Sequence, residues 1–477
     1  MAKYRCPLCG WAYDEDAEGA PFSTLERCPM CGAAASEFYR VEDDGVTPAP
    51  DAPQEAAPEV APADAASDDS LAVPPELRRN DPTIRHMDTI HALAEHGRLA
   101  DGAMATTLPL PKWEDILVLG AQLDPMPLQE EAVPDISVTI GADAARPLAL
   151  EGPAFVSHMS FGALSREAKI ALARGAAAAG TAMCSGEGGI LPEELEAAGS
   201  RYIFEFAPLR YSVTDENLRA AAAIEIKIGQ GTKPGMGGHL PGEKVTEEIA
   251  RIRGRKPGED IISPSTIPGV EGVDDLTALV DGLRERSLGA PIGIKLAAGH
   301  IERDIAVAVE AGADFVTIDG RGGATGASPV MLRDASSVPT IFALARARRA
   351  LDDLESPASL IITGGLRVAS DVVKALALGA DAVALASASL MALGCQQYRI
   401  CGSGLCPMGI ATQDPELRAR LDIERSARRV ENFYRATFDD VRMFCRVMGH
   451  NSVKDLSIDD LVTCDAAIAE RCGIARA

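Results

Sequence analysis

The chain has few aromatic side chains, few positive charges and no long apolar segment. A membrane helix needs about eighteen or more consecutive apolar residues, and no run reaches that length. The first residues reach Cys6 without the apolar segment of a signal peptide, so we expect a cytoplasmic protein with no membrane partner. Lys and Arg number 46 against 70 Asp and Glu, and the net charge of −24 repels phosphate backbones, which argues against nucleic-acid binding.

The apolar content is nevertheless sufficient for a large core, because 47% of the 477 residues are hydrophobic. Eight short apolar segments recur, and helical patterns rich in Ala and Leu separate several of them. These segments are 154–157, 181–183, 202–204, 224–228, 291–296, 315–319, 361–363 and 381–385. Such alternation predicts an α/β fold with a parallel sheet. We predict a (β/α)8 TIM barrel over residues 151–420 and a helical segment over 421–477, with an open doubly wound sheet as the alternative.

Residues 1–40 contain two Cys-x2-Cys pairs, a strong signal for a tetrahedral metal site because two hairpins together supply four sulfur ligands. The ligands would be Cys6, Cys9, Cys28 and Cys31. This spacing does not separate iron from zinc. Aromatic residues near the first pair and the closing Phe38 and Tyr39 resemble rubredoxin. We therefore predict a small N-terminal rubredoxin-like metal domain that holds one iron, with structural zinc as the alternative.

An acidic, proline-rich stretch follows this domain. Between Val41 and Pro75 there is no Lys or Arg, and the composition is too polar to pack, so we predict a disordered linker over 41–80. The linker would act either as a tether for the metal domain or as a passive spacer. An amphipathic helix is predicted over 81–97, followed by an irregular, proline-containing layer up to residue 150.

Three further cysteines lie within twelve residues, at Cys395, Cys401 and Cys406. Three cysteines so close in the sequence favour an iron–sulfur cluster over disulfides in a reducing cytoplasm. The alternative is that they are inert core cysteines. Three thiolates suffice for a 3Fe-4S cluster, whereas a 4Fe-4S cluster would need a fourth ligand that the sequence does not identify. The remaining cysteines are scattered, and we expect them to be structural: Cys184, Cys445, Cys464 and Cys472.

Barrel enzymes carry their chemistry at the carboxyl ends of the strands. After the second predicted strand, Glu187 lies between glycines that would let a substrate reach its carboxylate. After the fourth, a glycine-rich loop surrounds Lys233, as expected for a backbone wrapped around a small anionic ligand, and its residue order is not that of a Walker A loop. Lys295, in the fifth strand, would need a partner if it faces the interior. Gly364 and Gly365, after the seventh, predict a phosphate site.

From about residue 108 to the C-terminus, these motifs resemble, in the same order, the FMN and iron–sulfur synthase domain of glutamate synthase in its short archaeal-type form. The spacing of Cys395, Cys401 and Cys406 resembles the 3Fe-4S loop of that family. The resemblance implies that FMN binds to residues in or next to the barrel loops: Met159, Ser160, Gln230, Lys295, Asp319, Gly322, Gly323, Gly364, Gly365 and Ala386.

The same resemblance implies a substrate site. Lys233 and Arg253 would bind 2-oxoglutarate, and Glu187 would handle the incoming ammonia. His239 stands where bacterial and plant members of the family usually carry Gln, a departure that bears on the substrate or on its protonation. We include His239 among the predicted catalytic residues.

We therefore predict a glutamate synthase-type oxidoreductase that converts 2-oxoglutarate and ammonia to L-glutamate with FMN, reduced through the iron–sulfur and rubredoxin centres. We find no glutaminase domain before the barrel, so ammonia would come free or from a separate glutaminase (amidotransferase) subunit. An electron-donor protein or reductase subunit would supply the electrons. Two alternatives are the related N-methylglutamate synthase, which uses methylamine, and a non-catalytic FMN electron-transfer subunit. The set of Glu187, Lys233 and Arg253 argues against the non-catalytic alternative.

Overall fold

The computed structural model describes residues 104–326 and 328–477 without a break, together with shorter stretches between residues 3 and 102. The chain forms two compact units, one of residues 1–102 with 329–331 and one of residues 103–328 with 332–477. Most of the predicted linker lies outside the described residues. So do the four predicted ligands of the N-terminal metal site: Cys6, Cys9, Cys28 and Cys31.

The described part of the first unit contains a small antiparallel sheet and a helix. Phe22 stacks on Tyr4 with ring centroids 3.9 Å apart and lies 5.2 Å from the ring of Phe38. Helix α2 (Met87–His96) begins later than the predicted residue 81, because His86 adopts a left-handed conformation before it. The sheet has the order β2 (Ala12–Asp14), β1 (Lys3–Arg5), β3 (Tyr39–Glu42) and β4 (Gly45–Val46).

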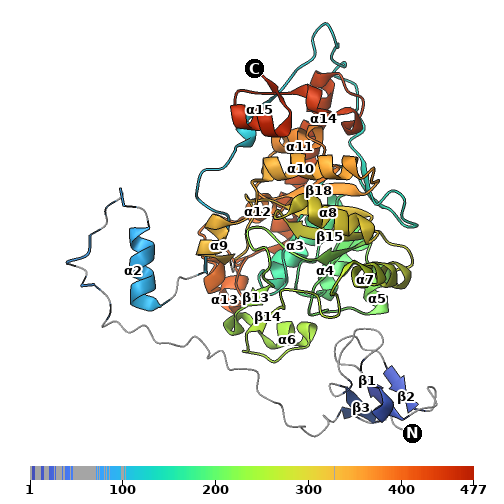
Figure 1. Ribbon diagram of the computed structural model, residues 1–477, viewed down its shortest axis with the longest axis vertical. Coiled ribbons are helices and arrows are strands. Elements are labelled where there is room, and N and C mark those ends of the chain that lie inside the picture. Colours follow the sequence, from blue (N-terminus) through green and yellow to red (C-terminus); the bar gives the residue numbers. More distant parts are fainter. Residues whose placement is uncertain are drawn as a thin grey trace. The chain divides into compact units, whose positions relative to one another are not determined.

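The second unit is a closed barrel of eight parallel strands (Figure 1). β9 pairs with both β10 and β19, which closes the ring and excludes the open doubly wound sheet. Each strand overlaps one of the predicted segments, so the predicted (β/α)8 fold is confirmed. The strands are β9 (Ala154–Val156), β10 (Met183–Cys184), β11 (Tyr202–Phe206), β12 (Ala223–Lys227), β15 (Ile292–Ala297), β16 (Phe315–Asp319), β18 (Ser359–Thr363) and β19 (Ala382–Leu385).

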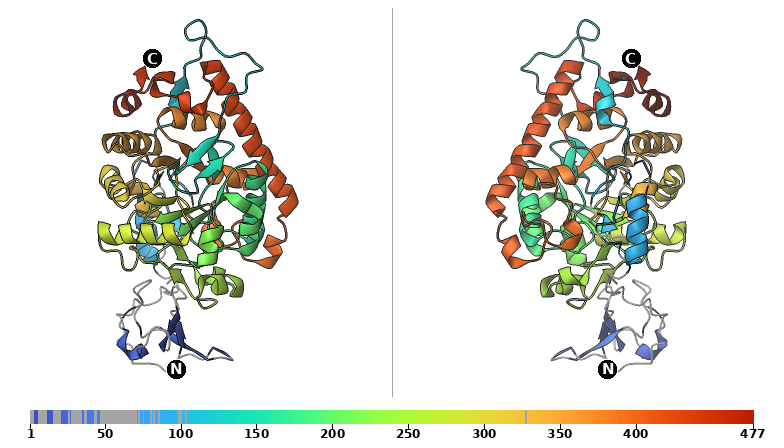
Figure 2. Two further views of the ribbon diagram at one scale, coloured as in Figure 1. Left: turned by 90° about the vertical axis from the view of Figure 1, so that its right-hand side faces the viewer. Right: turned by 90° about the vertical axis from the view of Figure 1, so that its left-hand side faces the viewer.

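Helices connect the strands and cover the outside of the barrel, as the right-handed crossovers of βα units require (Figures 1 and 2). They are α3 (Arg166–Ala178), α4 (Pro192–Ala198), α5 (Asp215–Ala220), α6 (Glu247–Arg253), α7 (Val273–Arg286), α8 (Ile301–Glu310), α10 (Thr340–Asp353), α11 (Ala369–Ala377) and α12 (Ser387–Leu393). No helix among the residues that the structure describes is long and apolar enough to cross a membrane.

Helix α3 packs against α14 (Ile423–Met448), the long helix that runs along the barrel wall in Figure 2. Ser165 caps α3 by accepting a hydrogen bond from a backbone N–H of its first turn. Gly175 permits the close contact, because a Cβ at this position would lie 2.6 Å from both the carbonyl oxygen of Ala427 and the Cβ of Val430. A larger residue here would push the two helices apart.

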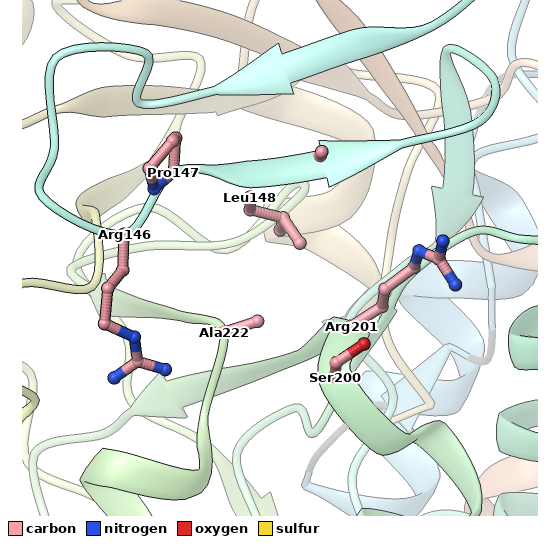
Figure 3. Close-up of a pocket in the computed structure, with 7 residues that line it drawn as sticks. Arg146, Pro147, Leu148, Ser200, Arg201 and Ala222 are labelled. Atoms are coloured by element: carbon pink, nitrogen blue, oxygen red, sulfur yellow. The ribbon is translucent and has the colours of Figure 1, made fainter.

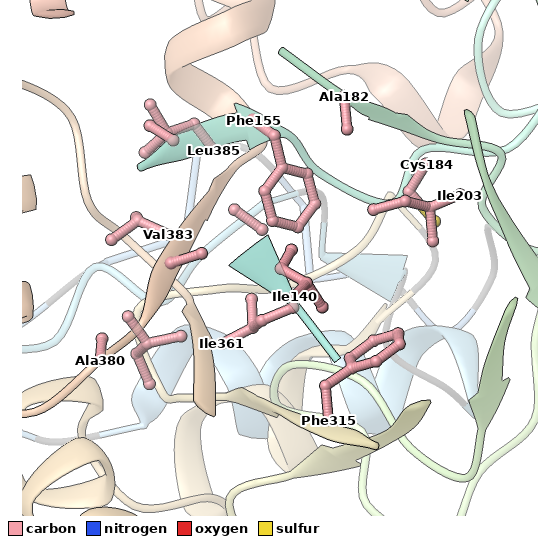
Figure 4. Close-up of a cluster of buried hydrophobic side chains, with 14 of the residues drawn as sticks. Ile140, Phe155, Ala182, Cys184, Ile203, Phe315, Ile361, Ala380, Val383 and Leu385 are labelled. Atoms are coloured by element: carbon pink, nitrogen blue, oxygen red, sulfur yellow. The ribbon is translucent and has the colours of Figure 1, made fainter. Parts of the chain in front are cut away.

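A hairpin of β7 (Val138–Ile140) and β8 (Leu148–Leu150) closes the amino-terminal end of the barrel. The N–H of Gly141 donates to the hydroxyl of Ser359, the first residue of β18, at 3.1 Å. The side chain of Ile140 lies among the apolar core residues of the barrel (Figure 4).

A pocket of about 300 Å³ lies beside this hairpin (Figure 3). Its lining includes Arg201 and Ala222, which directly precede β11 and β12, so the pocket belongs to the end of the barrel opposite the catalytic loops. The other end of the barrel is therefore the expected place of the active site.

A strand from the layer before the barrel pairs with the C-terminal strands in one small sheet. β6 (Ile116–Val118) pairs antiparallel with β20 (Leu461–Thr463), and β20 also pairs with β21 (Ala475–Arg476). The ammonium of Lys374 donates to the carbonyl oxygen of Trp113 at 2.9 Å, which ties this small sheet region to helix α11. The irregular layer before the barrel is thus part of the same packed unit.

Candidate active site at the carboxyl end of the barrel

Glu187 lies in the loop after β10 and is held by two neighbouring side chains. Its carboxylate forms an ion pair with Lys227, the last residue of β12, and accepts a hydrogen bond from the hydroxyl of Ser263. Burial opposes ionisation of Glu187, but Lys227, Ser263 and the nearby Arg253 outweigh it and lower the pKa of the carboxyl group. Glu187 is therefore a carboxylate at neutral pH.

Glycines make room around this carboxylate. A Cβ on Gly238 would lie 2.4 Å from a carboxylate oxygen of Glu187, so the loop after β12 touches Glu187 with its bare backbone. Gly186 has a φ of 68°, and a Cβ there would lie 2.6 Å from the backbone of Met159 and Ser160. The loops after β9, β10 and β12 therefore meet around Glu187.

Arg253, at the end of α6, brings a second buried charge to the same place. One of its Nη atoms donates to the carbonyl oxygen of Phe161 at 2.6 Å, and its guanidinium lies over the ring of Tyr211, 5.2 Å from the centroid. Its Nε is buried and has no hydrogen-bond partner among the described residues. Because a buried donor without an acceptor is costly, this position suits an anionic ligand.

Lys233 is fully buried in the glycine-rich loop after β12, which begins near Gln230. The Ser336 hydroxyl donates to the carbonyl oxygen of Thr232 at 3.2 Å, and that of Ser337 donates to the carbonyl oxygen of Gly231 at 2.9 Å. Two hydrogen bonds from adjacent serines thus hold the backbone of this loop in place.

His239 lies apart from this buried set. It forms the short strand β13 (His239–Leu240), which pairs with β14 (Ile261–Ile262), and its Nε2 lies 3.0 Å from the carboxylate of Asp260. One third of the His239 side chain is exposed. The structure therefore gives His239 a surface carboxylate as its partner, while Glu187 pairs with Lys227.

Two glycine-rich loops, after β16 and β18, pack backbone against backbone. A Cβ on Gly322 would lie 2.5 Å from the carbonyl oxygen of Gly364, and a Cβ on Gly323 would lie 2.5 Å from the carboxylate of Asp319. Gly364 and Gly365 have φ values of 115° and 98°, which favour glycine. These two loops, here called the glycine cradle, meet at bare backbone at the end of the barrel where backbone N–H groups commonly bind a phosphate.

The remaining predicted flavin residues lie next to these loops. A Cβ on Gly231, the neighbour of Gln230, would lie 3.1 Å from Ala324 in the loop after β16. Ala386 directly follows β19 and precedes α12. The backbone N–H of Ser157, at the end of β9, donates to the carbonyl oxygen of Leu385 at 3.1 Å, so the loops after β9 and β19 are also neighbours.

A buried ion pair fixes the loop that carries Met159. The ammonium of Lys169 donates to the carbonyl oxygens of Met159 at 2.5 Å and Ser185 at 2.8 Å, and lies 2.9 Å from the carboxylate of Glu194. Both charged side chains are fully buried. Burial raises the pKa of Glu194 to about 7, although Lys169 opposes this shift.

Below these loops the barrel contains a polar layer that the sequence reasoning missed, apart from Lys295. The Lys295 ammonium lies 3.3 Å from the carboxylate of Glu205, and Glu225 forms an ion pair with His158. Donor atoms of His158, Cys184, Glu205 and Glu225 lie within 4.8 Å of one another. Burial opposes the charge on Lys295, but Glu205 and other nearby carboxylates raise its pKa.

A sequence signal for these residues does exist. Glu225 and Lys227 occupy alternate positions of a strand that is otherwise apolar, so both side chains must point to the same side of the sheet. Two charges on the inner side of a barrel strand require partners, and the structure supplies His158 and Glu187.

The predicted cluster ligands come together in the segment after α12. The backbone and side-chain N–H groups of Gln397 both lie 3.4 Å from the sulfur of Cys395. Burial raises the pKa of the Cys401 thiol, and the neighbouring Cys395 and Cys406 raise it further, which places the three thiols in one electrostatic group. All three are free thiols. Their donor set fits an iron–sulfur cluster.

The cysteine segment touches the loop after β16. A Cβ on Gly326 would lie 3.5 Å from the Cβ of Cys401, and a Cβ on Gly402 would lie 3.0 Å from the carbonyl oxygen of Gly326. The predicted flavin cradle and the predicted cluster therefore share one glycine-rich loop.

Comparison with known proteins identifies the family. The family model described as "conserved region in glutamate synthase" matches residues 84–451. The archaeal-type glutamate synthase (NADPH) of Thermotoga maritima is 38% identical over 413 residues, which cover 80% of this chain and 81% of that protein. The archaeal glutamate synthase (NADPH) of Methanocaldococcus jannaschii is 44% identical over 313 residues, covering 65% of this chain and 61% of that protein.

A third relative, the glutamate synthase large subunit-like protein of Rhizobium meliloti, is 38% identical over 387 residues, or 76% of this chain and 87% of that protein. The family match spans the whole barrel, including the Glu187 loop, the glycine-rich loops and the cysteine segment. This chain belongs to the glutamate synthase family.

Proposed function

We propose that this oxidoreductase makes L-glutamate at the carboxyl end of its barrel, by reductive amination of 2-oxoglutarate with ammonia. The observation that carries the proposal is the gathering of an ionised Glu187, held by Lys227 and Ser263, with the buried Arg253. These charges lie beside a glycine-rich loop that encloses Lys233.

The cations would bind the keto acid. 2-Oxoglutarate carries two carboxylates, and buried cations attract such groups more strongly than exposed ones because the local dielectric constant is low. Arg253 already donates one hydrogen bond to the carbonyl oxygen of Phe161, and its buried Nε has no partner among the described residues and could bind a ligand. Lys233 would supply the second positive charge from a loop whose glycines permit close approach.

Glu187 would bind the nitrogen substrate. Its lowered pKa makes it a weak base, so we assign it the binding and orientation of ammonium by charge rather than strong general-base catalysis. Loss of a proton from the bound ammonium to water would free ammonia to attack the keto carbon of 2-oxoglutarate, and return of a proton to the resulting hydroxyl would let water leave and give an iminium. Lys227 keeps Glu187 ionised throughout.

The glycine cradle and Lys295 are suited to FMN, which when bound would supply the hydride and convert single electrons into pairs. The residues that would hold it are Met159, Ser160, Gln230, Lys295, Asp319, Gly322, Gly323, Gly364, Gly365 and Ala386. Lys295 would place positive charge where a reduced flavin becomes negative. The loops after β16 and β18 support this assignment, because their glycine backbones pack directly together at the end of the barrel where phosphate sites commonly form.

Cys395, Cys401 and Cys406 would hold a 3Fe-4S cluster, and the N-terminal cysteines a rubredoxin-type iron. The shared glycine-rich loop supports electron transfer between cluster and flavin, because Gly326 contacts Cys401 and belongs to the same loop as Gly322. Electrons would come from a separate donor protein or reductase subunit, and ammonia would come free or from a separate glutaminase subunit.

Glutamate formation from 2-oxoglutarate and ammonium, with a chemical reductant and without other proteins, tests the proposal. We expect turnover with ammonium and bound FMN in the purified protein. Turnover with methylamine in preference to ammonium would favour an N-methylglutamate synthase. Absence of turnover with both amines, in protein that holds reducible FMN, would contradict the proposed activity.

A further inference from the structure

Lys244 is a buried lysine next to the cysteine segment. It ends the 3-10 turn η6 (Gly242–Lys244) and is 7% exposed. Its ammonium donates to the carbonyl oxygen of Cys401 at 2.5 Å. A Cβ on Gly404 would lie 3.1 Å from its Cε, so the glycine lets the lysine stem pass close to the cysteine turn.

The charge of Lys244 has no carboxylate partner within 4.0 Å among the residues that the structure describes. Three other strongly buried lysines near the site each have one: Lys169 pairs with Glu194, Lys227 with Glu187 and Lys295 with Glu205. A buried ammonium without a counter-charge is costly. The acidic groups that act on Lys244 are the side chains of Cys401 and Cys406, which carry negative charge as thiolate ligands.

We propose that Lys244 is the counter-charge of the iron–sulfur cluster and raises its affinity for an electron. This inference rests on the proposed function, since it requires a cluster on Cys395, Cys401 and Cys406. A cluster with three thiolate ligands carries net negative charge, and reduction adds to it. A fixed cation in a poorly solvated position stabilises the reduced form more than the oxidised form.

Lys244 also lies on the chain segment that would bind the keto acid. The loop that encloses Lys233 leads through η6 into α6, which carries Arg253. The residue that contacts the cluster segment is therefore part of the same segment that would bind the keto acid. Lys244 thus acts as a positioning residue: it places a positive charge next to the cysteine segment, and no contact with the substrate is proposed for it.

The test is a redox titration of the cluster by EPR in Lys244→Met, with Lys244→Arg as the charge-preserving variant. Lys256→Met is the matched control, because Lys256 follows in the same segment but is 81% exposed and lies 3.6 Å from Glu259. Iron and acid-labile sulfide are measured in each protein. These readouts are independent of glutamate formation.

We expect Lys244→Met to keep its cluster but to be harder to reduce. At the parent midpoint potential the ratio of reduced to oxidised cluster should fall by about tenfold or more, equivalent to 59 mV for one electron. Lys244→Arg and Lys256→Met should change the ratio by less than about threefold, the first because the charge is retained and the second because an exposed charge is screened.

An unchanged midpoint in Lys244→Met with a full cluster would overturn the inference, as would an equal shift in Lys256→Met. If Lys244→Met loses the cluster while Lys244→Arg keeps it, the inference is supported, because the arginine retains the charge. Loss in both variants would overturn it, since the shape of lysine would then be what matters. A parent protein without acid-labile sulfide would overturn the proposed cluster itself and this inference with it.

Discussion

The site around Glu187 (the pocket, below) and the cysteine segment balance buried charge in different ways. In the pocket, the charge of Glu187 is balanced by Lys227, and Ser263 donates a hydrogen bond to it. At the cysteine segment, Lys244 is buried against the carbonyl oxygen of Cys401, and the described residues offer thiols but no carboxylate to balance it. The charge of Glu187 is therefore balanced by a protein cation alone, whereas that of Lys244 relies on the cysteine thiolates. Substitutions in the two regions should consequently fail in different ways.

The largest effect is expected from removing a thiol. Cys401→Ser should abolish acid-labile sulfide and the cluster EPR signal, because three ligands leave no spare donor, while FMN stays bound. Glutamate formation driven through the cluster should be lost with them. Cys464→Ser is the control, since Cys464 is exposed and lies outside the segment. Full sulfide content in Cys401→Ser would refute the assignment of this ligand.

In the pocket, Glu187→Gln should destabilise the protein as well as inactivate it. The change leaves Lys227 buried without a carboxylate, which should lower the free energy of unfolding by about 3 to 5 kcal/mol. The double variant Glu187→Gln with Lys227→Met should recover much of the stability but none of the activity. Denaturant unfolding and glutamate assays measure the two effects separately.

A surface ion pair provides the control for Glu187→Gln. Glu302 pairs with Arg346 at 2.6 Å at an exposed site, so Glu302→Gln should cost no more than about 1 kcal/mol. If Glu187→Gln and Glu302→Gln lower the free energy of unfolding equally, the buried pair of Glu187 and Lys227 contributes no more to stability than a surface ion pair.

Lys233→Ala should lower glutamate formation by about 30- to 1000-fold, corresponding to roughly 2 to 4 kcal/mol of lost transition-state binding. FMN should remain bound and reducible, because the proposed phosphate cradle lies in the loops after β16 and β18. Lys233→Arg should also be impaired, since it keeps the charge but enlarges the head group in a tightly packed loop. Parent-like turnover in Lys233→Ala would make the loop merely structural. Steady-state kinetics and flavin absorbance provide the readouts.

The smallest effect concerns pH. Because burial raises the pKa of Glu194 to about 7 in the folded state, folding favours its protonated form. Its contribution to stability is therefore fully present below about pH 4.5 and is lost as the pH rises to about 7, by on the order of 3 kcal/mol at most. The free energy of unfolding of the parent minus that of Glu194→Gln should therefore decrease as the pH rises over this range.

Thermal unfolding midpoints between pH 5 and about 8 measure this difference. Glu193→Gln is the matched control, because the neighbouring Glu193 is exposed and pairs with Arg166 at the surface. A difference that grows with pH would mean that the attraction of Lys169 outweighs burial at Glu194.

The sequence predicted those features that depend on local pattern. Alternating apolar segments located all eight strands. The start of α2 was placed too early, because the helical pattern does not reveal the left-handed turn at His86. Local pattern therefore predicts elements better than their ends.

Site residues were predictable where glycine marks a loop and less so where a contact depends on barrel closure. Glu187, Lys233 and the paired glycines after β18 stand out in the sequence. Ser263 and Lys244 do not, because each meets its partner only when distant segments fold together. The partner of His239, Asp260, directly precedes β14, whose pairing with β13 was not foreseen. Pairing between distant segments is a property of the folded barrel.

The pairing of β6 with β20 has a consequence for how genes of this kind can be rearranged. Met104 and Ala105, at the start of the barrel unit, contact Thr325 and Arg399 in the segments after β16 and α12. The C-terminal strands β20 and β21 instead lie in the sheet with β6 that is tied to helix α11. A module fused before the barrel would therefore start beside the loops at its carboxyl end, whereas a module fused after the barrel would start at this sheet, so reversing the gene order would change what the module can reach.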